Sequence, residues 1–216
     1  MKPKSKILIK WSPNFAYALG LIATDGNLSS DGRHLDMTSK DREQLTNFIY
    51  CFGLTNKIGY KKSGISDKSI SRIQFGDVNF YKFLLTIGFM PKKSKVIGNL
   101  EIPDKYFFDF LRGHFDGDGS FYSYWDKRWP SSYMFYTIFC SESKKHIIWL
   151  RNKIYELLKI KGHITKSPVK TCYQLKYAKN ESFKLIRKIY YSPDLICLKR
   201  KRLKIQKALA IIGLRL

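Results

Sequence analysis

Two apolar stretches of this chain follow nearly the same pattern and close on the same dipeptide. Residues 18–26 read ALGLIATDG, and residues 111–119 read LRGHFDGDG. Each stretch has a glycine in its third place and ends in an aspartate followed by glycine. A largely apolar run without strand-like alternation indicates a buried helix, and a glycine directly after the run is typical of a helix end. The pattern therefore predicts two buried helices that end at Asp25 and Asp118.

The similarity continues beyond these helices, so the chain is predicted to be a duplication. Helical patterns begin at Ser39 and at Ser141, and both serines are predicted N-caps. Alternating residues predict strands near 28–38, 57–62 and 69–75 in the first half, and near 120–125, 133–140, 162–167 and 172–177 in the second. Each half is expected to run helix, two strands, helix, two strands, helix.

The spacing between matching segments is not constant. It is 93 residues at the two aspartates and 102 at the two serines. We therefore expect nine additional residues in the second half, in an enlarged hairpin tip around residues 125–130. Residues 92–105 contain prolines, glycine and several lysines and are predicted to connect the halves. The predicted halves are residues 1–100, including most of this connector, and residues 101–216 with a basic C-terminal helix.

Glycine inside each motif helix predicts how the halves meet. Gly20 and Gly113 each cost roughly 1 kcal/mol relative to alanine in a helix, which is tolerated where two helices must approach closely. The two helices should then pack together and bring Asp25 and Asp118 to adjacent helix C-termini. Carboxylates there are unfavourable in the helix dipole, so a bound cation would compensate for them. Taken singly, each Asp-Gly pair is better explained as a helix-ending turn, so the metal-site hypothesis depends on the pair of motifs together.

Charge points to a polyanionic partner. The chain has 40 lysines and arginines against 17 aspartates and glutamates, a net charge of +23. Such an excess favours binding to nucleic acid, because each neutralised phosphate releases counterions. A ribosomal or other RNA-scaffold protein fits the charge equally well. No apolar run is long enough to span a membrane, and the four scattered cysteines indicate neither zinc nor disulfides. An intracellular protein is therefore expected.

The paired motifs resemble the signature of the LAGLIDADG homing endonucleases, in the single-chain form with two copies. The resemblance covers essentially the whole chain. It implies an α+β fold of two pseudo-symmetric αββαββα halves, packed through the motif helices, with an antiparallel β saddle that lies on double-stranded DNA. It also implies hydrolysis of one phosphodiester in each strand of a long asymmetric site, leaving short 3′ overhangs. Because both copies share one chain, we expect a monomer.

The resemblance assigns candidate roles to individual residues. Asp25 and Asp118 match the metal-binding position of each motif, and Mg²⁺ is the expected ion, with Mn²⁺ or Ca²⁺ able to substitute for binding. Two lysine-rich clusters match the place of a catalytic lysine, and Lys93 and Lys201 are the candidates, although the clusters suit phosphate binding equally well. Asp116, which replaces an alanine of the first motif, is expected to be structural.

Strand alternation predicts which side chains face the DNA. We expect Ile73, Phe75, Leu175 and Tyr177 to face the helices. The residues predicted to face outward and bind DNA are His34, Asp36, Thr38, Lys57, Lys61, Arg72, Gln74, Lys161, His163, Thr165, Gln174 and Lys176. Arginine and lysine suit guanine edges and glutamine suits adenine, whereas contacts to phosphate alone are the alternative. Ser39 and Ser141 could also order water near the metal, but helix capping is their favoured role.

Two other functions remain compatible with this fold. An RNA maturase would use the basic surface to bind intron RNA, and a regulator would bind DNA without cutting it. A regulator is expected to carry an additional helix-turn-helix domain, for which no residues are left over. Retention of both Asp25 and Asp118 favours the nuclease. Bacterial or archaeal cytoplasm, mitochondrion and chloroplast are all compatible with the composition.

Overall fold

Seven helices and eight strands make up the described part of the chain. The computed structural model describes residues 5–62, 69–167 and 171–216. The first half contains α1 (Pro13–Thr24), β1 (Gly26–Leu28), β2 (His34–Ser39), α2 (Arg42–Phe52), β3 (Gly59–Lys62), β4 (Ser69–Gly76) and α3 (Val78–Thr86). The second contains α4 (Phe107–Asp118), β5 (Ser120–Trp125), β6 (Tyr133–Ser141), α5 (Lys144–Leu158), β7 (His163–Lys166), β8 (Tyr173–Ala178), α6 (Lys179–Ile189) and α7 (Lys199–Ala210). The 3₁₀ turns η1 (Lys93–Lys95) and η2 (Asp104–Tyr106) lie between the halves.

Each half is built around a four-stranded antiparallel sheet. The strand orders are β1-β2-β4-β3 and β5-β6-β8-β7, so the two sheets have the same topology. The stretch predicted near 28–38 holds a hairpin of two strands, β1 and β2. These matching sheets confirm the predicted α+β class and the duplication. They also make β1 and β5, which directly follow the two motif helices, the edge strands of their sheets.

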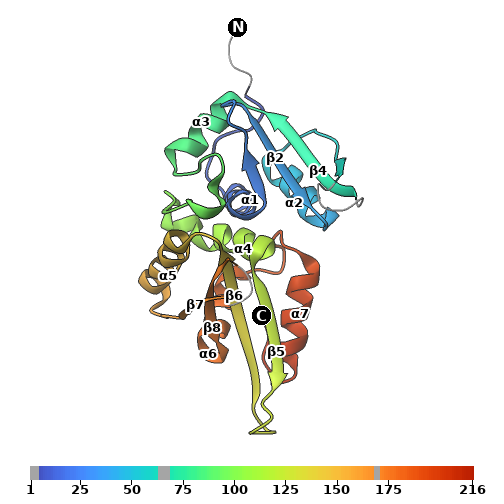
Figure 1. The fold of residues 1–216 in the computed structure, drawn as a ribbon. Coiled ribbons are helices and arrows are strands. Elements are labelled where there is room, and N and C mark those ends of the chain that lie inside the picture. Colours follow the sequence, from blue (N-terminus) through green and yellow to red (C-terminus); the bar gives the residue numbers. More distant parts are fainter. Residues whose placement is uncertain (1–4, 63–68, 168–170) are drawn as a thin grey trace.

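The motif helices α1 and α4 pack against each other between the two halves (Figure 1). A Cβ atom added to Gly20 would lie 2.1 Å from the carbonyl oxygen of Phe110, and one added to Gly113 would lie 1.9 Å from that of Tyr17. Both distances are far too short for a side chain. The close approach predicted from the two glycines is therefore confirmed, and it is a contact between backbones.

The core surrounds these helices on nearly all sides. Residues 15–23 of α1 are all buried, and so are residues 109–116 of α4. Helices that are apolar around their whole circumference belong in a core. In the first half the core beside α1 is aromatic. Phe15 of α1, Phe52 and Phe80 contact one another edge to face.

The caps of the second helices differ from the prediction. Asp41 is the N-cap of α2 and accepts a hydrogen bond from the Glu43 amide, and Ser143 is the N-cap of α5. Ser39 and Ser141 were predicted to cap these helices, and this is wrong. Both helices begin later because each predicted serine is still the last residue of a strand, which holds it in the sheet ladder.

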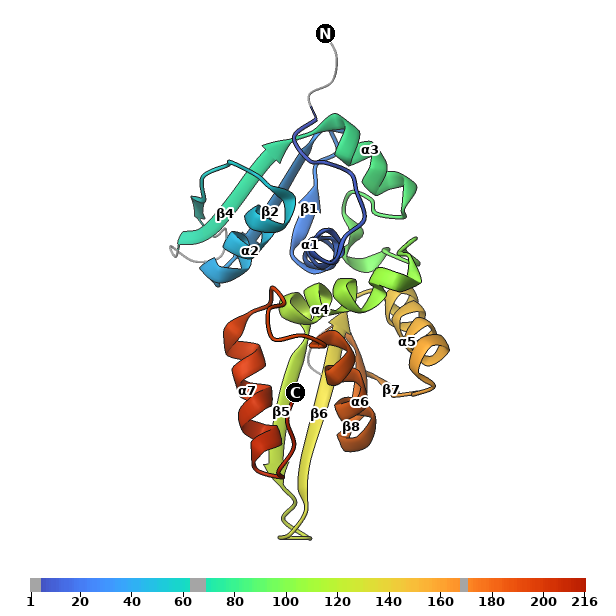
Figure 2. The same ribbon diagram turned by 180° about the vertical axis from the view of Figure 1, so that it is seen from behind.

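The β5–β6 hairpin projects far beyond its counterpart in the first half (Figure 2). Its loop spans residues 126–132 and closes with a hydrogen bond from the Asp126 amide to the Ser132 carbonyl, 2.9 Å. The enlarged hairpin tip expected around residues 125–130 is thus confirmed. No helix in the described ranges is long and apolar enough to cross a membrane.

Candidate active site

Asp25 caps the C-terminus of α1, and its carboxylate is held in place by two donors. The Asp25 amide donates to the Leu21 carbonyl at 2.9 Å and so completes the last helical turn. Its Oδ2 accepts from Gln44 Nε2 at 2.6 Å and from the hydroxyl of Thr24 at 3.1 Å. Gln44 lies on the first turn of α2, so the packing of α2 on α1 fixes the orientation of the carboxylate.

Asp118 ends α4 and lies beside Asp25. A Cβ atom added to Gly117 would come 2.7 Å from Asp25 Oδ2, which places the first carboxylate directly against the last turn of α4. The Asp118 side chain is exposed. Among the residues that the structure describes, none donates a hydrogen bond to its carboxylate. The two motif aspartates therefore meet as predicted, but with different surroundings.

The two carboxylates disturb each other's ionisation. Although Asp118 is exposed, the protein atoms around it partly desolvate its carboxyl group, and this is the main cause of a raised pKa. The nearby charge of Asp25 raises the pKa of Asp118 further, to about 6. Burial also raises the pKa of Asp25, while the hydrogen bonds from Gln44 and Thr24 oppose the rise. A bound cation would relieve this repulsion.

Two lysines, Lys93 buried and Lys201 half-buried, occupy matching places at the ends of the motif helices. Lys93 Nζ donates to the carbonyls of Thr24 and Gly26, at 3.3 and 2.6 Å. Lys201 Nζ donates to four carbonyls at the end of α4, those of Phe115, Asp116, Gly117 and Gly119, at 2.6, 2.8, 3.3 and 2.7 Å. A cation at a helix C-terminus is favoured by the helix dipole.

The environment of these lysines lowers their basicity. Burial lowers the pKa of Lys93 and of Lys201 to about 8, although Asp25 and Asp118 both act in the opposite direction. Both ammonium groups are therefore charged below about pH 8. The register chosen from the sequence brings both lysines to the aspartates, and their catalytic role stays a prediction.

The donor set of this site suits a hard cation. Its free acidic groups are carboxylates, and Mg²⁺ prefers oxygen ligands from one or two carboxylates together with water and substrate phosphates. The described residues contain no group of three or more histidine, cysteine, aspartate or glutamate side chains that could enclose an ion by themselves. A metal held by Asp25 and Asp118 would consequently need further ligands from a phosphate or water.

Asp116 has a structural place, in agreement with its expected role. It is buried, and its Oδ2 accepts hydrogen bonds from the Tyr17 hydroxyl at 2.8 Å and from the Leu198 amide at 2.7 Å. Tyr17 belongs to α1, and Leu198 is the N-cap of α7. Asp116 thus joins the two motif helices to the helix that carries Lys201. Burial raises its pKa to about 6.

Sequence reasoning missed two polar residues at the centre of the molecule. Gln44 was not singled out, although its place three residues after Asp41 is a recognisable signal for an inward-facing polar side chain at a helix start. Arg112 is fully buried and pairs with Asp109 at 2.8 Å, while its guanidinium also donates to the carbonyls of Ile189 and Ile196. The spacing of Asp109 and Arg112 on one helix face is the only sequence signal for this pair.

The strand faces follow the predicted alternation. Ile73, Phe75, Leu175 and Tyr177 are buried beneath the helices. None of the twelve predicted DNA-binding residues is buried. On the first sheet Asp36 pairs with Gln74 and Thr38 with Arg72, and on the second His163 pairs with Lys176 and Thr165 with Gln174. Lys61 lies on β3, whereas Lys57 and Lys161 are exposed in the loops just before β3 and β7. Contact with DNA stays a prediction for this set.

Asp36 and Arg72, two of the predicted outward residues, already contact each other. Asp36 accepts from Asn27 Nδ2 at 3.0 Å and forms an ion pair with Arg72 at 3.2 Å. This network fixes the Arg72 side chain on the outer face of the first sheet.

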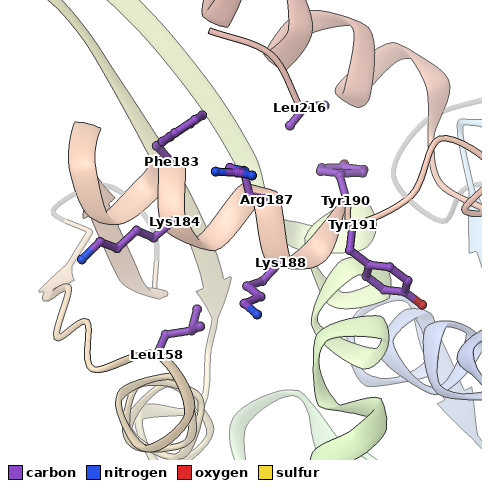
Figure 3. A pocket seen from close by; sticks show the side chains of 8 residues that line it. All are labelled: Leu158, Phe183, Lys184, Arg187, Lys188, Tyr190, Tyr191 and Leu216. Atoms are coloured by element: carbon purple, nitrogen blue, oxygen red, sulfur yellow. The ribbon is translucent and has the colours of Figure 1, made fainter.

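A cavity of about 880 Å³ lies apart from the aspartates, between the end of α5, α6 and the C-terminal residue (Figure 3). Its lining residues are Leu158, Phe183, Lys184, Arg187, Lys188, Tyr190, Tyr191 and Leu216. The guanidinium of Arg187 lies 5.7 Å from the centre of the Phe183 ring. None of the lining residues belongs to α1 or α4, so the cavity is not part of the candidate active site.

Solved structures with this architecture are known. No family model and no curated protein match the chain. The homing endonuclease I-WcaI bound to its DNA recognition sequence has a TM-score of 0.63 at 14% identity, over 92% of this chain and 88% of that one. The meganuclease I-SmaMI bound to uncleavable DNA has a TM-score of 0.60 at 16% identity, over 93% of this chain and 91% of that one.

A second kind of protein shares the same fold. Full-length DUF199/WhiA from Thermatoga maritima has a TM-score of 0.58 at 16% identity, over 96% of this chain. This chain spans 63% of the length of that protein. The N-terminal LAGLIDADG domain of WhiA matches over 93% of this chain and 90% of that one, with a TM-score of 0.54 at 15% identity. Its two matching sheets, its paired motif helices and its similarity to these structures together show that the chain has the LAGLIDADG fold.

Proposed function

We propose that this protein is a metal-dependent DNA endonuclease that cuts both strands of a long asymmetric site and leaves short 3′ overhangs. The observation that carries the proposal is the pair of carboxylates, Asp25 and Asp118, brought together at the ends of the motif helices with a lysine held by backbone carbonyls beside each. A fold that only bound DNA would gain nothing from two mutually repelling acids at its centre.

The residues at this site would have three different roles in hydrolysis: binding the metal, orienting a carboxylate and supplying positive charge. Asp25 and Asp118 would hold Mg²⁺, which when bound activates water and neutralises charge on a scissile phosphate. Gln44 orients the Asp25 carboxylate. Lys93 and Lys201 add positive charge close to the same point, where negative charge develops on the phosphate. Both lysines are fixed by backbone carbonyls, so this charge is positioned before the substrate arrives.

The neighbours and the surface charge support DNA as the substrate. Two of the similar structures are DNA complexes, and the net charge of +23 favours a polyanion. The outward faces of the two sheets begin directly after the aspartates, at β1 and β5. Duplex DNA lying along both sheets would place its backbone over the two carboxylates. A single chain with two unlike halves suits an asymmetric site and a monomeric enzyme.

The test is cleavage selection on a randomised DNA library. Purified protein is incubated with the library and Mg²⁺, and the cut ends are sequenced. Asp25→Asn and Asp118→Asn serve as controls, because each removes one metal-binding charge while keeping the size of the side chain. Defined ends with short 3′ overhangs, produced by the native protein and lost by at least about a thousandfold in both variants, are the expected result.

Three outcomes would contradict the proposal. Full cleavage by either variant would refute the shared metal site. Sequence-specific duplex binding without cleavage by the native protein would indicate a regulator, and preference for intron RNA would indicate a maturase.

A further inference from the structure

The outward faces of the two sheets differ in chemistry. On β1 and β2 the outward side chains are all polar, namely Asn27, His34, Asp36 and Thr38. On β5 and β6 the same face holds Ser120, Tyr122, Tyr124, Met134, Tyr136 and Ile138, of which all but the serine are apolar or aromatic and only Ile138 is buried. The two hairpins have the same topology. They differ in the chemistry of their outward side chains and in the extra length of β5–β6.

Three of these residues form an ordered stack, which we call the tyrosine ladder: Tyr122, Tyr124 and Tyr136. Tyr122 and Tyr136 are cross-strand partners with ring centres 5.0 Å apart and planes 13° from parallel. Tyr124 stacks at 6.2 Å on Tyr122 and at 6.3 Å on Tyr136, with planes within 9°. The rings therefore stand side by side on the sheet as one rigid unit.

The ladder exposes more apolar surface than a sheet needs for its own stability. Tyr122 is 38% exposed and Tyr124 is 42% exposed. Cross-strand aromatic pairs stabilise a sheet, but large aromatic surface left in water is unfavourable unless a partner covers it. A ladder that is already stacked loses little side-chain freedom on binding. These properties suit a recognition surface.

Duplex DNA is the occupant that the charge and position of the ladder favour. The ladder lies on the same face of the second sheet as Lys176 and Gln174, and Arg128 stands near Tyr124 and Tyr136. These cations would bring phosphates to both sides of the rings. In the major groove the one strongly apolar feature of a base edge is the thymine methyl group.

We propose that the tyrosine ladder reads thymine methyl groups in the half-site bound by the second sheet, while the first sheet reads its half-site by polar contacts. This inference rests on the proposed DNA-binding function and deepens it. It makes the target asymmetric in chemistry as well as in sequence, with thymines concentrated under the extended hairpin.

Replacing thymine with deoxyuridine removes only the methyl group and so tests the proposal directly. A binding site is first selected from random duplexes, without metal. Thymines are then replaced in one half-site at a time, and binding is measured by fluorescence anisotropy in the absence of metal. We expect roughly fourfold weaker binding for each thymine lost in one half-site, the ratio that corresponds to about 0.8 kcal/mol per buried methyl group, and little change in the other.

Three variants assign the effect to the ladder. Combined Tyr122→Thr and Tyr136→Thr substitutions should abolish the deoxyuridine effect, with circular dichroism confirming the fold. Replacing all three tyrosines with phenylalanine keeps the rings and should preserve the effect. Tyr155→Thr, at an exposed tyrosine on α5 away from the sheets, is the matched control and should leave the effect unchanged.

Several outcomes would overturn the inference. They are equal sensitivity to deoxyuridine in both half-sites, an effect that survives the threonine variants, and a preference for single strands that depends on the tyrosines. Failure to bind any duplex would overturn the proposed function as well. Specific binding without cleavage would refute only the endonuclease, because the deoxyuridine effect is measured by binding.

Discussion

The two aspartates occupy equivalent helix ends, yet they are held differently. Asp25 accepts hydrogen bonds from Gln44 and Thr24, whereas Asp118 has no donor among the described residues and stays exposed. The lysines differ in the opposite sense, since Lys93 contacts two carbonyls and Lys201 contacts four. In the first half the carboxylate is the better-fixed group, and in the second it is the lysine.

The difference arises at two positions of the repeat. Thr24 is matched by Gly117, which has no side-chain donor, and Gln44 is matched by His146. His146 lies 102 residues after Gln44, at the same turn of the equivalent helix. Its ring does not reach Asp118 but contacts the Gly98 carbonyl at 2.9 Å and stacks on His114 at 5.3 Å. Duplication has thus preserved the backbone contacts at the helix ends, while the side chains around the carboxylates have diverged.

The largest expected effect tests what the halves still share. Gly20→Ala and Gly113→Ala should each lower the free energy of unfolding by more than about 3 kcal/mol, because a methyl group would overlap a backbone carbonyl of the partner helix. The contact is reciprocal, so the two losses should be similar. Urea denaturation measures both. Gly98→Ala, which has open space around it, is the control, and an equally small loss in all three would contradict the backbone contact.

Replacing Lys93 and Lys201 should lower the free energy of unfolding by different amounts, because the two lysines contact different numbers of carbonyls. Lys201→Met removes the ammonium donor shared by four carbonyls, of which the Phe115 carbonyl keeps its bond from the Gly119 amide. It should cost about 2–3 kcal/mol, against about 1–2 kcal/mol for Lys93→Met, since carbonyls that lose a donor away from water carry a desolvation penalty. Thermal and urea unfolding give both values. Lys204→Met on the exposed face of α7 controls for the loss of charge. Equal losses at Lys93 and Lys201 would show that the number of carbonyl contacts does not matter.

Gln44 should matter for cleavage more than for stability. Gln44→Leu removes a donor from Asp25, and a loss of about tenfold in the single-turnover rate is expected, which corresponds to about 1.4 kcal/mol. His146→Gln, at the equivalent position, should leave the rate of the folded protein within about twofold, since His146 does not contact Asp118. A comparable loss in both variants would contradict the assignment of Gln44 as the positioning residue.

The smallest effect concerns the pH dependence of Asp118. Its pKa in the folded protein is raised to about 6, so its protonated form is favoured by folding. The stabilisation this gives is complete below the unfolded pKa near 4 and is lost as the pH rises through 6. In metal-free buffer, Asp118→Asn should therefore melt a few degrees above the native protein at pH 7 and at nearly the same temperature at pH 4.

A metal ion should reverse that order. Because Mg²⁺ binds the native pair of carboxylates better than the variant, its addition at pH 7 should raise the melting temperature of the native protein by more than that of Asp118→Asn. Asp25→Asn should gain less than Asp118→Asn in metal-free buffer, because it also weakens the hydrogen bond from Gln44. A gap between Asp118→Asn and the native protein that is constant from pH 4 to pH 7 would contradict this account.

Much of the architecture could be predicted because it depends on local sequence patterns. The strands, the enlarged hairpin tip and the approach of the two glycines follow from alternation, spacing and the steric needs of helix contacts. The helix caps could not be settled this way. Ser39 and Asp41 are both good cap residues, and the choice depends on how far β2 continues its ladder with β4.

The parts of the site that escaped prediction depend on tertiary contacts. Gln44 reaches Asp25 only because α2 packs on α1, and nothing in the intervening sequence encodes that distance. Arg112 sits in a helix that the pattern predicts to be buried, where a cation is unexpected, and its partners at Ile189 and Ile196 are distant in sequence. Lys93 and Lys201 were found through the family resemblance, because a lysine-rich cluster follows the last helical segment of each half where the family carries a catalytic lysine.

The backbone contact at Gly20 and Gly113 has a consequence for recombination. A helix contact made by two glycines involves backbone atoms only. Either half could therefore be exchanged for a foreign one that carries glycine at the same place. Side-chain contacts that cross between the halves, such as the Tyr17–Asp116 hydrogen bond and the Asp41–Arg200 ion pair, would have to be transplanted with the exchange as matched pairs. Chimaeras built from this chain would then combine two sheets of separate origin around the same pair of packed helices.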